Sequence, residues 1–413
     1  MNLWHDLQRE LDNRAAAHLT RELRRVPDGV LDLASNDYLG LARHPRVIEA
    51  AQSAAAKYGT GARASRLVSG HTDLIEELEN ELARFKGTEA ALVFSSGYAA
   101  NLGVVTALCD GDTALFCHKR NHASLLDACE LAKAPVRFWE SNDKLRALLQ
   151  SSNSRRKIIV CDGVFSMDGD LCDLPAIVAL AEEFDAIILL DDAHGTGTLG
   201  ASGRGTAEHY GIEAGLTPSS NRREFLESSP IGRGTALAPP GDHPASHRII
   251  TLGTLSKALG SQGGFVCGPR VLIDYLIGAA RSFVYSTGLN PPAAGAALEA
   301  LSIIQSEPER VEQCRYNTEI LVRELGASGY DVVWQPSPIL PVFADDSKAA
   351  LHLSAQLLKK KLWCPAIRPP TVKRARLRLT SNASWDDDDL ERIIVAFAIL
   401  PGNRISPPTP ARQ

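Results

Sequence analysis

One lysine stands out because of the residues around it. Lys257 lies between a short apolar run at 248–252 and a string of glycines, in the segment TLSKALGSQGG at 254–264. A lysine removed from water has a lowered pKa, and its free amine can act as a nucleophile or base. The segment therefore suggests a lysine that forms a Schiff base with a carbonyl compound. These residues alone leave a phosphate-contacting or ordinary surface lysine as alternatives.

A carboxylate and an imidazole follow a fully apolar run. Residues 186–190 (AIILL) are predicted to form a buried strand, and Asp191 and His194 come directly after it. Ligands of α/β sheets collect at the carboxyl ends of the strands, so these side chains are candidate site residues. The segment GTGTLG at 195–200 formally matches a dinucleotide fingerprint. We reject that interpretation because no amphipathic helix opens after it and no acidic strand end lies about twenty residues on.

A turn of small residues provides a second group of candidates. Residues 90–94 predict a strand, and Ser-Ser-Gly-Tyr at 95–98 leads into a helix. Free backbone N–H groups and the helix dipole would suit a phosphate at Gly97 and Tyr98. A plain connection between strand and helix is the alternative. Ser166, in a glycine-bounded loop after another predicted strand, completes this group.

Together these residue types match the needs of pyridoxal phosphate. A lysine holds its aldehyde, an aspartate keeps its ring nitrogen protonated, and hydroxyl groups with a helix N-terminus bind its phosphate. An aromatic or imidazole ring stacks on the pyridine, and His122 is the candidate for that position. Each feature is weak alone, but their combination favours this cofactor.

The elements that would position these residues alternate along the chain. The repeated strand–helix order predicts an α/β fold with a mostly parallel sheet and helices on both of its faces. We expect an N-terminal helix and strand segment at 1–44, a large domain at 45–290, a small α+β domain at 291–400 and a disordered tail at 401–413. Residues 207–247 contain five prolines and little periodicity, which predicts a surface insertion.

Two local expectations complete this description. Apolar residues at helical spacing predict a leading amphipathic helix over 3–25, and an apolar run predicts a strand over 332–334.

The composition is that of an ordinary globular protein. The chain has 413 residues, is 44% hydrophobic and carries a net charge of −5, which gives no reason to expect nucleic acid or a membrane as partner. Its charged N-terminus lacks a signal-type apolar segment, so we expect a cytoplasmic location. Eight cysteines without a C-x-x-C pair indicate reduced thiols. Cys117, His118 and His122 are too poor a ligand set to predict a metal site.

Nine segments resemble the α-oxoamine synthase family of pyridoxal-phosphate enzymes. They are SNDYLGL (35–41), ASRLVSGHT (64–72), FSSGYAAN (94–101), NHASLLDA (121–128), DGVFSMDGD (162–170), DDAHGTGTLG (191–200), TLSKALGSQGG (254–264), VYST (284–287) and AIRPPTV (366–372). The resemblance extends over nearly the whole chain. It implies a fold-type I transferase, assembled as a homodimer with active sites at the subunit interface.

The resemblance also implies roles for the residues that bind the cofactor. Lys257 would form the Schiff base and later remove the Cα proton of the amino acid. Asp191 would pair with the ring nitrogen, His194 would hydrogen-bond the ring hydroxyl, and His122 would stack on the ring. The residues expected to seat the cofactor, chiefly its phosphate, are Gly97, Tyr98, Ser166 and Thr254, with Thr287 reaching the neighbouring subunit's cofactor.

Three further residues match positions that contact substrate in the family. Arg368 would hold the carboxylate of the amino acid through a bidentate fork. Thr371 and Arg21 would contact substrate as well, although a solvated helix residue is the alternative for Arg21. The segment after Thr371 is shorter than relatives usually carry, which leaves the acyl end of the site less defined.

The implied reaction is a decarboxylative condensation of an amino acid with an acyl thioester. The segment AIRPPT at 366–371 favours L-alanine and a pimeloyl thioester of coenzyme A or an acyl carrier protein. Sister synthases with another amino acid or acyl chain are the alternatives: 2-amino-3-ketobutyrate ligase, 5-aminolevulinate synthase or a sphingolipid-type palmitoyltransferase. A non-catalytic binding subunit with the same fold is the alternative from another class.

Overall fold

The computed structural model describes residues 2–16, 19–20, 23–212 and 248–400. The predicted tail, Arg21 and most of the predicted insertion lie outside these residues. The described start of that insertion contains the end of a short helix, α8 (Thr206–His209), and a turn.

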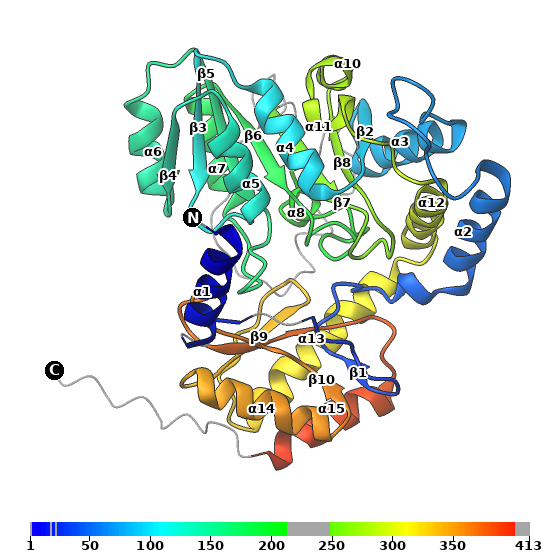
Figure 1. The fold of residues 1–413 in the computed structure, drawn as a ribbon, viewed down its shortest axis with the longest axis vertical. Coiled ribbons are helices and arrows are strands. Elements are labelled where there is room, and N and C mark those ends of the chain that lie inside the picture. The colour runs from blue at the N-terminus through cyan, green and yellow to red at the C-terminus, as the bar shows by residue number, and fades with distance from the viewer. Residues whose placement is uncertain (1, 17–18, 21–22, 213–247, 401–413) are drawn as a thin grey trace.

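A seven-stranded sheet forms the centre of the larger part of the molecule (Figure 1). The strand order is β2-β8-β7-β6-β5-β3-β4, and β8 runs in the direction opposite to the other six strands. The strands are β2 (Ala90–Phe94), β3 (Thr113–His118), β4 (Val136–Trp139), β5 (Arg156–Asp162), β6 (Ala186–Asp191), β7 (Ile249–Thr254) and β8 (Gly264–Gly268). The mostly parallel sheet predicted from the sequence is confirmed.

Helices cover both faces of this sheet, because its strands are apolar on both sides. In β2, Leu92 and Phe94 belong to a core with residues of α4, α5 and α10, whereas Ala91 and Val93 belong to a core with residues of α3 and α12. The helices of the larger part are α2 (Pro45–Tyr58), α3 (Asp73–Lys86), α4 (Gly97–Leu108), α5 (Ala123–Leu131), α6 (Asn142–Gln150), α7 (Leu174–Glu183), α10 (Arg270–Ala279), α11 (Arg281–Val284) and α12 (Pro291–Ser306).

Two of these helices start next to the carboxyl ends of the strands. Ser96 caps α4 with a side chain that accepts a hydrogen bond from the Ala99 N–H at 3.1 Å. His122 caps α5, and its Nδ1 accepts from the Ser124 N–H at 3.2 Å. Such caps satisfy backbone groups that the first helical turn leaves free.

A second, smaller part lies below the sheet in Figure 1. It contains the antiparallel sheet β11-β12-β9 and the parallel pair β1-β10. Its elements are β1 (Leu31–Asp32), α13 (Glu309–Ala327), β9 (Ile339–Phe343), α14 (Ser347–Lys359), β10 (Leu362–Trp363), β11 (Ala366–Ile367), β12 (Arg376–Thr380) and α15 (Asp387–Ile399). Leu33, from near the start of the chain, is buried in the same core as Leu377 and Phe397.

The predicted domain boundary at residue 291 stays a prediction. Residues of α12 share a core with α2 and α3 in the larger part, whereas the separate core of the smaller part includes Leu321 and Leu325 of α13. The hydrophobic cores therefore divide within α13.

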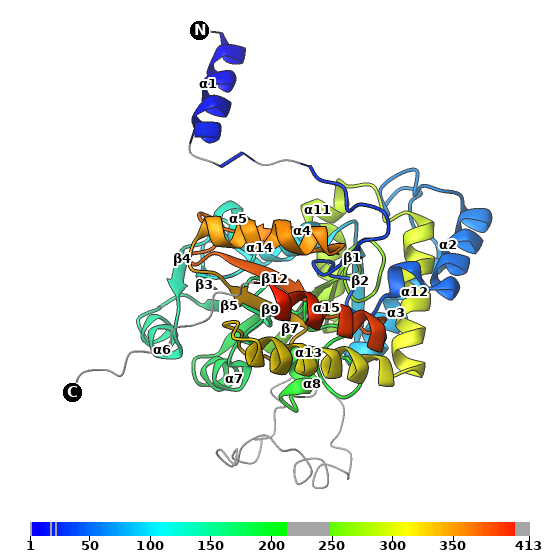
Figure 2. The same cartoon turned by 90° about the horizontal axis from the view of Figure 1, so that it is seen from below.

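Two local predictions were wrong. The leading helix, α1, is described over Leu3–Ala16 and not to residue 25. Its residues are exposed, and Figure 2 shows it standing away from the rest of the molecule. Residues 332–334 form no strand, because Val332 makes only a single bridge to Val342.

In the described part of the chain, no helix is both long and apolar enough to cross a bilayer.

The ring of His118 packs against aromatic neighbours, with its centroid 4.6 Å from those of both Trp139 and Phe165.

Candidate active site

A cavity of about 220 Å³ opens where β5, β6 and β7 end and α4 begins. Parallel strands end at the same edge of a sheet, which brings together side chains distant in the sequence. Seven of the predicted site residues line this cavity: Gly97, Tyr98, His122, Asp191, His194, Thr254 and Lys257.

Lys257 follows β7, and among the described residues its ammonium group has a single hydrogen-bond partner, the Nε2 of His194 at 2.9 Å. The residue lies deep among protein atoms, although its side chain borders the cavity and keeps some accessible surface. Burial lowers the pKa of Lys257 to about 8, against the opposing effect of the Asp191 and Asp162 carboxylates. A useful fraction of the amine is therefore unprotonated near neutral pH, as nucleophilic chemistry requires.

Asp191 ends β6 and presents a buried carboxylate to the cavity. Its Oδ2 accepts from Asn101 Nδ2 at 2.7 Å, and its Oδ1 accepts from the Ala193 N–H at 3.0 Å. Asn101 lies on α4 and also donates to Ser124 Oγ at 2.8 Å. These contacts fix the carboxylate in one orientation, which suits it to pair with a protonated ring nitrogen.

A second carboxylate, Asp162, lies at the end of β5 beside Asp191. Its Oδ2 accepts from the His122 N–H at 3.0 Å, but its buried Oδ1 has no partner among the described residues. Burial, and then the charge of Asp191, raises the pKa of Asp162 well above its usual value. An unpartnered buried oxygen in a cavity wall is typical of a place where a ligand completes the hydrogen bonding.

His194 is buried, and each nitrogen of its ring has a hydrogen-bond partner among the described residues. Its Nε2 faces Lys257, and its Nδ1 lies 2.6 Å from the hydroxyl of Tyr38. Burial, with the charge of Lys257, lowers the pKa of His194 well below its usual value, so its imidazole is neutral.

His122 supplies a flat ring to the wall of the same cavity. Its Nδ1 lies 2.7 Å from Ser124 Oγ, so the ring is held by the first turn of α5. A fixed planar ring can stack on a planar ligand.

The start of α4 forms a cradle of small residues. A Cβ on Gly97 would lie 3.3 Å from Thr254 Cβ, and a Cβ on Gly264 would lie 2.4 Å from the Ser96 carbonyl oxygen. Thr254 Oγ1 lies 2.7 Å from Ser256 Oγ, which places two hydroxyl groups beside the free N–H groups of the helix. Helix N–H groups and hydroxyls are phosphate ligands, so the residues present fit pyridoxal phosphate at this end as well as at the lysine.

Comparison with known proteins identifies the family. The family model described as aminotransferase class I and II matches residues 28–397. The chain belongs to the class I and II aminotransferase family. Within it, the chain is 40% identical over 403 residues to an 8-amino-7-oxononanoate synthase from Lysinibacillus sphaericus, covering 94% of this chain and 95% of that relative. It is 42% identical over 411 residues to a putative 8-amino-7-oxononanoate synthase from Desulforudis audaxviator, covering 95% and 97%.

Solved structures agree with this class I and II membership. The serine palmitoyltransferase of Sphingomonas wittichii superposes with a TM-score of 0.83 at 26% identity, over 96% of this chain and 98% of that one. A high-resolution structure of SPT with the PLP internal aldimine has the same TM-score at 25% identity and the same coverage. The 8-amino-7-oxononanoate synthase of Francisella tularensis, at 24% identity, has a TM-score of 0.69 over 90% and 98% and shows the fold alone. The predicted fold class is confirmed.

Four other predicted site residues are described but do not line this cavity: Ser166, Thr287, Arg368 and Thr371. The Ser166 carbonyl accepts a hydrogen bond from Arg378 Nε at 2.5 Å. Thr287 is exposed after α11, and Arg368 and Thr371 lie in the turn between β11 and β12. Their roles stay predictions, and Arg21 lies outside the described residues.

Arg378 acts on the site although it does not line the cavity, and the sequence analysis missed it. It lies on β12, its side chain is buried, and its charge contributes to lowering the pKa values of both Lys257 and His194. The signal was present in the sequence, since Arg376 and Arg378 alternate with leucines in an otherwise apolar strand. Two arginines on one face of a buried strand need anionic or carbonyl partners.

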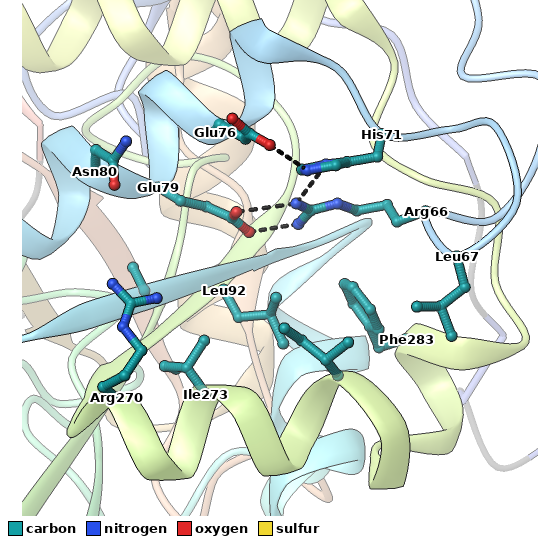
Figure 3. Close-up of a pocket in the computed structure, with 12 residues that line it drawn as sticks. Arg66, Leu67, His71, Glu76, Glu79, Asn80, Leu92, Arg270, Ile273 and Phe283 are labelled. Carbon is teal, nitrogen blue, oxygen red and sulfur yellow. Dashed lines mark hydrogen bonds and ion pairs between the residues drawn. The ribbon is translucent and has the colours of Figure 1, made fainter.

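A second cavity, of about 310 Å³, lies between the loop at 59–72, α3, β2 and α10. Figure 3 shows Arg66 between Glu79 and His71 in its wall. Arg66 and Glu79 form a buried bidentate ion pair, and His71 Nε2 lies 2.8 Å from Glu76 Oε1. Because these charges pair with one another, no lysine amine without an ion pair is found among the described residues that line this cavity, unlike the first one.

Proposed function

We propose that this chain is a pyridoxal-phosphate-dependent acyltransferase of the 8-amino-7-oxononanoate synthase type. It condenses L-alanine with a pimeloyl thioester and yields 8-amino-7-oxononanoate, carbon dioxide and the free thiol, a step of biotin biosynthesis. The observation that carries the proposal is the Lys257 amine, which borders the first cavity with a lowered pKa and has no ion pair among the described residues. The chain's similarity to curated synthases over nearly its full length supports the choice of reaction.

Pyridoxal phosphate, when bound, supplies an electron sink for the charge left on the amino-acid Cα. Lys257 would hold the cofactor through its aldehyde carbon and would take the Cα proton of the amino acid on Nζ. Asp191 would keep the ring nitrogen protonated, and His122 would stack on the ring. The N–H groups at the start of α4, with the hydroxyls of Thr254 and Ser256, would hold the phosphate.

The side chain that binds the substrate carboxylate is proposed to be Arg378, in preference to Arg368. Arg378 Nη1 donates to Asn36 Oδ1 at 3.2 Å, and its charge acts on both Lys257 and His194. An arginine held this close to the reacting amine can orient the carboxylate of the amino acid.

Assembly and location are part of the same proposal. The protein is a cytoplasmic homodimer with active sites at the subunit interface, and Thr287 reaches the cofactor of the neighbouring subunit. The exposure of Thr287 and of the apolar face of α1, with Trp4 at 73%, leaves both available to a second subunit. The acyl carrier is coenzyme A or an acyl carrier protein.

A substrate panel tests the proposed reaction. The purified protein is incubated with pyridoxal phosphate, single amino acids and acyl thioesters, and free thiol is measured. We expect visible absorption from the bound cofactor, and the fastest thiol release with L-alanine and a pimeloyl thioester. A preference for glycine or serine would assign the chain to a sister synthase. No cofactor absorption at all would leave a non-catalytic binding subunit.

Paired arginine variants test the carboxylate site. We expect Arg378→Lys to raise the KM for L-alanine by about 10- to 100-fold, the size of a lost hydrogen bond to a charged group. Arg368→Lys should change this KM less than Arg378→Lys. Circular dichroism of both variants controls for folding, because Arg378 also contacts Ser166 and Asn36. A larger effect at Arg368 would restore the assignment made from the sequence.

A further inference from the structure

A continuous series of hydrogen bonds joins Arg378 to Lys257 through the N-terminal segment. Arg378 Nη1 lies 3.2 Å from Asn36 Oδ1, which in turn lies 3.0 Å from the Tyr38 hydroxyl. That hydroxyl lies 2.6 Å from His194 Nδ1, and His194 Nε2 lies 2.9 Å from Lys257 Nζ. Tyr38 is completely buried. The four contacts therefore form one network closed off from solvent at its centre.

The donors and acceptors in this network allow one arrangement of hydrogens in which every contact is favourable. The guanidinium of Arg378 can only donate, so the amide of Asn36 must turn its oxygen toward it. The hydroxyl of Tyr38 has one hydrogen, and facing an amide oxygen it must donate that hydrogen to Asn36. Its oxygen can then only accept from His194, so Nδ1 of that ring carries the hydrogen.

The same assignment of donors and acceptors determines the state of His194 Nε2. A neutral ring with hydrogen on Nδ1 has a bare Nε2, and a bare Nε2 accepts from the ammonium of Lys257. The opposite tautomer would leave the oxygens of Tyr38 and Asn36 facing each other without a hydrogen. It would also direct an N–H of His194 at the hydrogens of a protonated Lys257.

The surroundings keep each member of the network in this state. Burial lowers the pKa of His194 well below its usual value, with the charges of Lys257, Arg378 and His122 acting in the same direction. Burial raises the pKa of Tyr38 to about 12, against the charge of Arg378, so the hydroxyl keeps its hydrogen. The carboxylates that act on Lys257 are Asp191 and Asp162.

We propose that Tyr38, oriented by Asn36, is a positioning residue that fixes His194 as its Nδ1–H tautomer. An acceptor is thereby held beside Lys257. Its consequence for the reaction rests on the proposed function: when Lys257 takes the Cα proton, one hydrogen of the new ammonium already has an acceptor at Nε2. The tautomer itself does not depend on that function.

The tautomer can be measured directly in the full-length protein by nitrogen NMR with ring-labelled histidine. His194→Gln assigns the signals by their loss. We expect Nδ1 of His194 to show the shift of a protonated nitrogen and Nε2 that of a bare one, before any cofactor is added. The reverse pattern in the unmodified protein would overturn the proposal, whatever reaction the protein catalyses.

Asn36→Ala provides a variant that does not touch His194. Removal of the amide oxygen frees the hydroxyl hydrogen of Tyr38, which can then be donated to Nδ1. We expect the His194 signals to reverse in this variant. Unchanged signals would show that Asn36 and Tyr38 do not set the tautomer, because a purely structural role for Asn36 gives no reason for them to reverse.

Tyr38→Phe tests the consequence for catalysis, with Tyr330→Phe as the matched control. Tyr330 is also buried, and its hydroxyl donates to the Phe397 carbonyl at 2.9 Å in the core of the smaller part. We expect Tyr38→Phe to lower kcat about 5- to 10-fold, the size of one lost buried hydrogen bond, and to shift the pH–rate profile. Tyr330→Phe should lower only the Tm. Identical pH–rate profiles for the two variants would contradict the role of Tyr38.

Discussion

Lys86 and Lys257 are both largely removed from water, but their surroundings differ. Lys86 ends α3, and its Nζ donates to Asp192 Oδ2 at 2.9 Å, to Thr196 Oγ1 at 2.7 Å and to the Arg204 carbonyl. All three ammonium hydrogens have partners, and the side chains of Lys86 and Asp192 are 4% and 2% exposed. This lysine is satisfied and serves the structure.

Lys257 has no such set of partners. Its Nζ contacts a single neutral nitrogen of His194, and no ion pair joins it to a carboxylate among the described residues. Its pKa is lowered to about 8, because burial outweighs the attraction of Asp191 and Asp162. A buried lysine thus becomes reactive when hydrogen-bond partners for its charged form are withheld, not through burial alone.

Asp191 and Asp192, which are adjacent at the end of β6, face different lysines. Asp191 faces the first cavity, whereas Asp192 faces Lys86 and accepts from Thr206 Oγ1 at 2.6 Å. A Cβ on Gly195 would lie 2.0 Å from Asp192 Oδ1, and one on Gly205 would lie 1.7 Å from Asp192 Oδ2. Of the glycines in the 195–200 pattern, Gly195 crowds this carboxylate, whereas a Cβ on Gly197 would lie 2.5 Å from Ala258 Cβ and one on Gly200 would lie 2.1 Å from Glu208 Oε2. Close packing therefore accounts for a pattern that only formally resembles a dinucleotide fingerprint.

The largest effect is expected from Lys257→Met. This change removes both the proposed covalent attachment and the proposed base, so we expect activity to fall by about 10⁴-fold, the upper end of the range for a positioned proton-transfer group. The Tm should not fall, because a poorly partnered amine is replaced by an apolar chain of similar length. Calorimetry and thiol release measure the two quantities. A large loss of Tm would mean that Lys257 also serves the structure.

Lys86→Met should have the opposite outcome. It leaves Asp192 charged and buried without its cation, which costs about 3–5 kcal/mol of unfolding free energy. Thermal unfolding measures the loss, and Lys119→Met is the control because the Lys119–Glu140 pair is exposed and contributes about 1 kcal/mol or less. If Lys86→Met and Lys257→Met changed the unfolding free energy equally, the distinction between Lys86 and Lys257 would be lost.

The smallest effect concerns stability as a function of pH. The pKa of Lys257 is about 8 in the folded protein against 10.5 as its ordinary value. Between these values the unfolded chain binds a proton that the folded protein does not, so this lysine makes stability rise with pH from about 8 to 10.5. We expect the Tm of the unmodified protein, relative to that of Lys257→Met, to rise with pH only in this range. Parallel curves at all pH values would contradict the lowered pKa.

The sequence predicted the part of the site that strand ends alone determine. Uninterrupted apolar strands fix where β6 and β7 end, and therefore that Asp191, His194 and Lys257 meet at one edge. Asn101 and Asp162 were missed because each lies near a predicted feature but has no sequence motif that marks it as a site residue. Their roles appear only when α4 and β5 are placed beside β6.

Other residues were missed because they depend on contacts between distant parts of the chain. Asn36 and Tyr38 reach the site because neighbouring backbone is bound by the C-terminal region: the Thr380 N–H donates to the Leu33 carbonyl at 2.8 Å, and the Ala383 N–H donates to the Tyr38 carbonyl at 2.8 Å. Local periodicity carries no information about such pairings. The strand at 332–334 was predicted incorrectly for the same reason: strand formation depends on pairing with a distant segment, and this apolar run makes only a single bridge.

The parallel pairing of β1 with β10 also constrains how the protein is made. Leu31 pairs with Leu362, so about 330 residues separate the two partners. A ribosome adds roughly 5–20 residues per second, which leaves the N-terminal segment without its partner strand for roughly 15 to 65 seconds. Because Tyr38 and Arg378 come from the two ends of this interval, the hydrogen-bond network that joins them to Lys257 is completed only near the end of synthesis, and a nascent chain truncated before β12 lacks part of it.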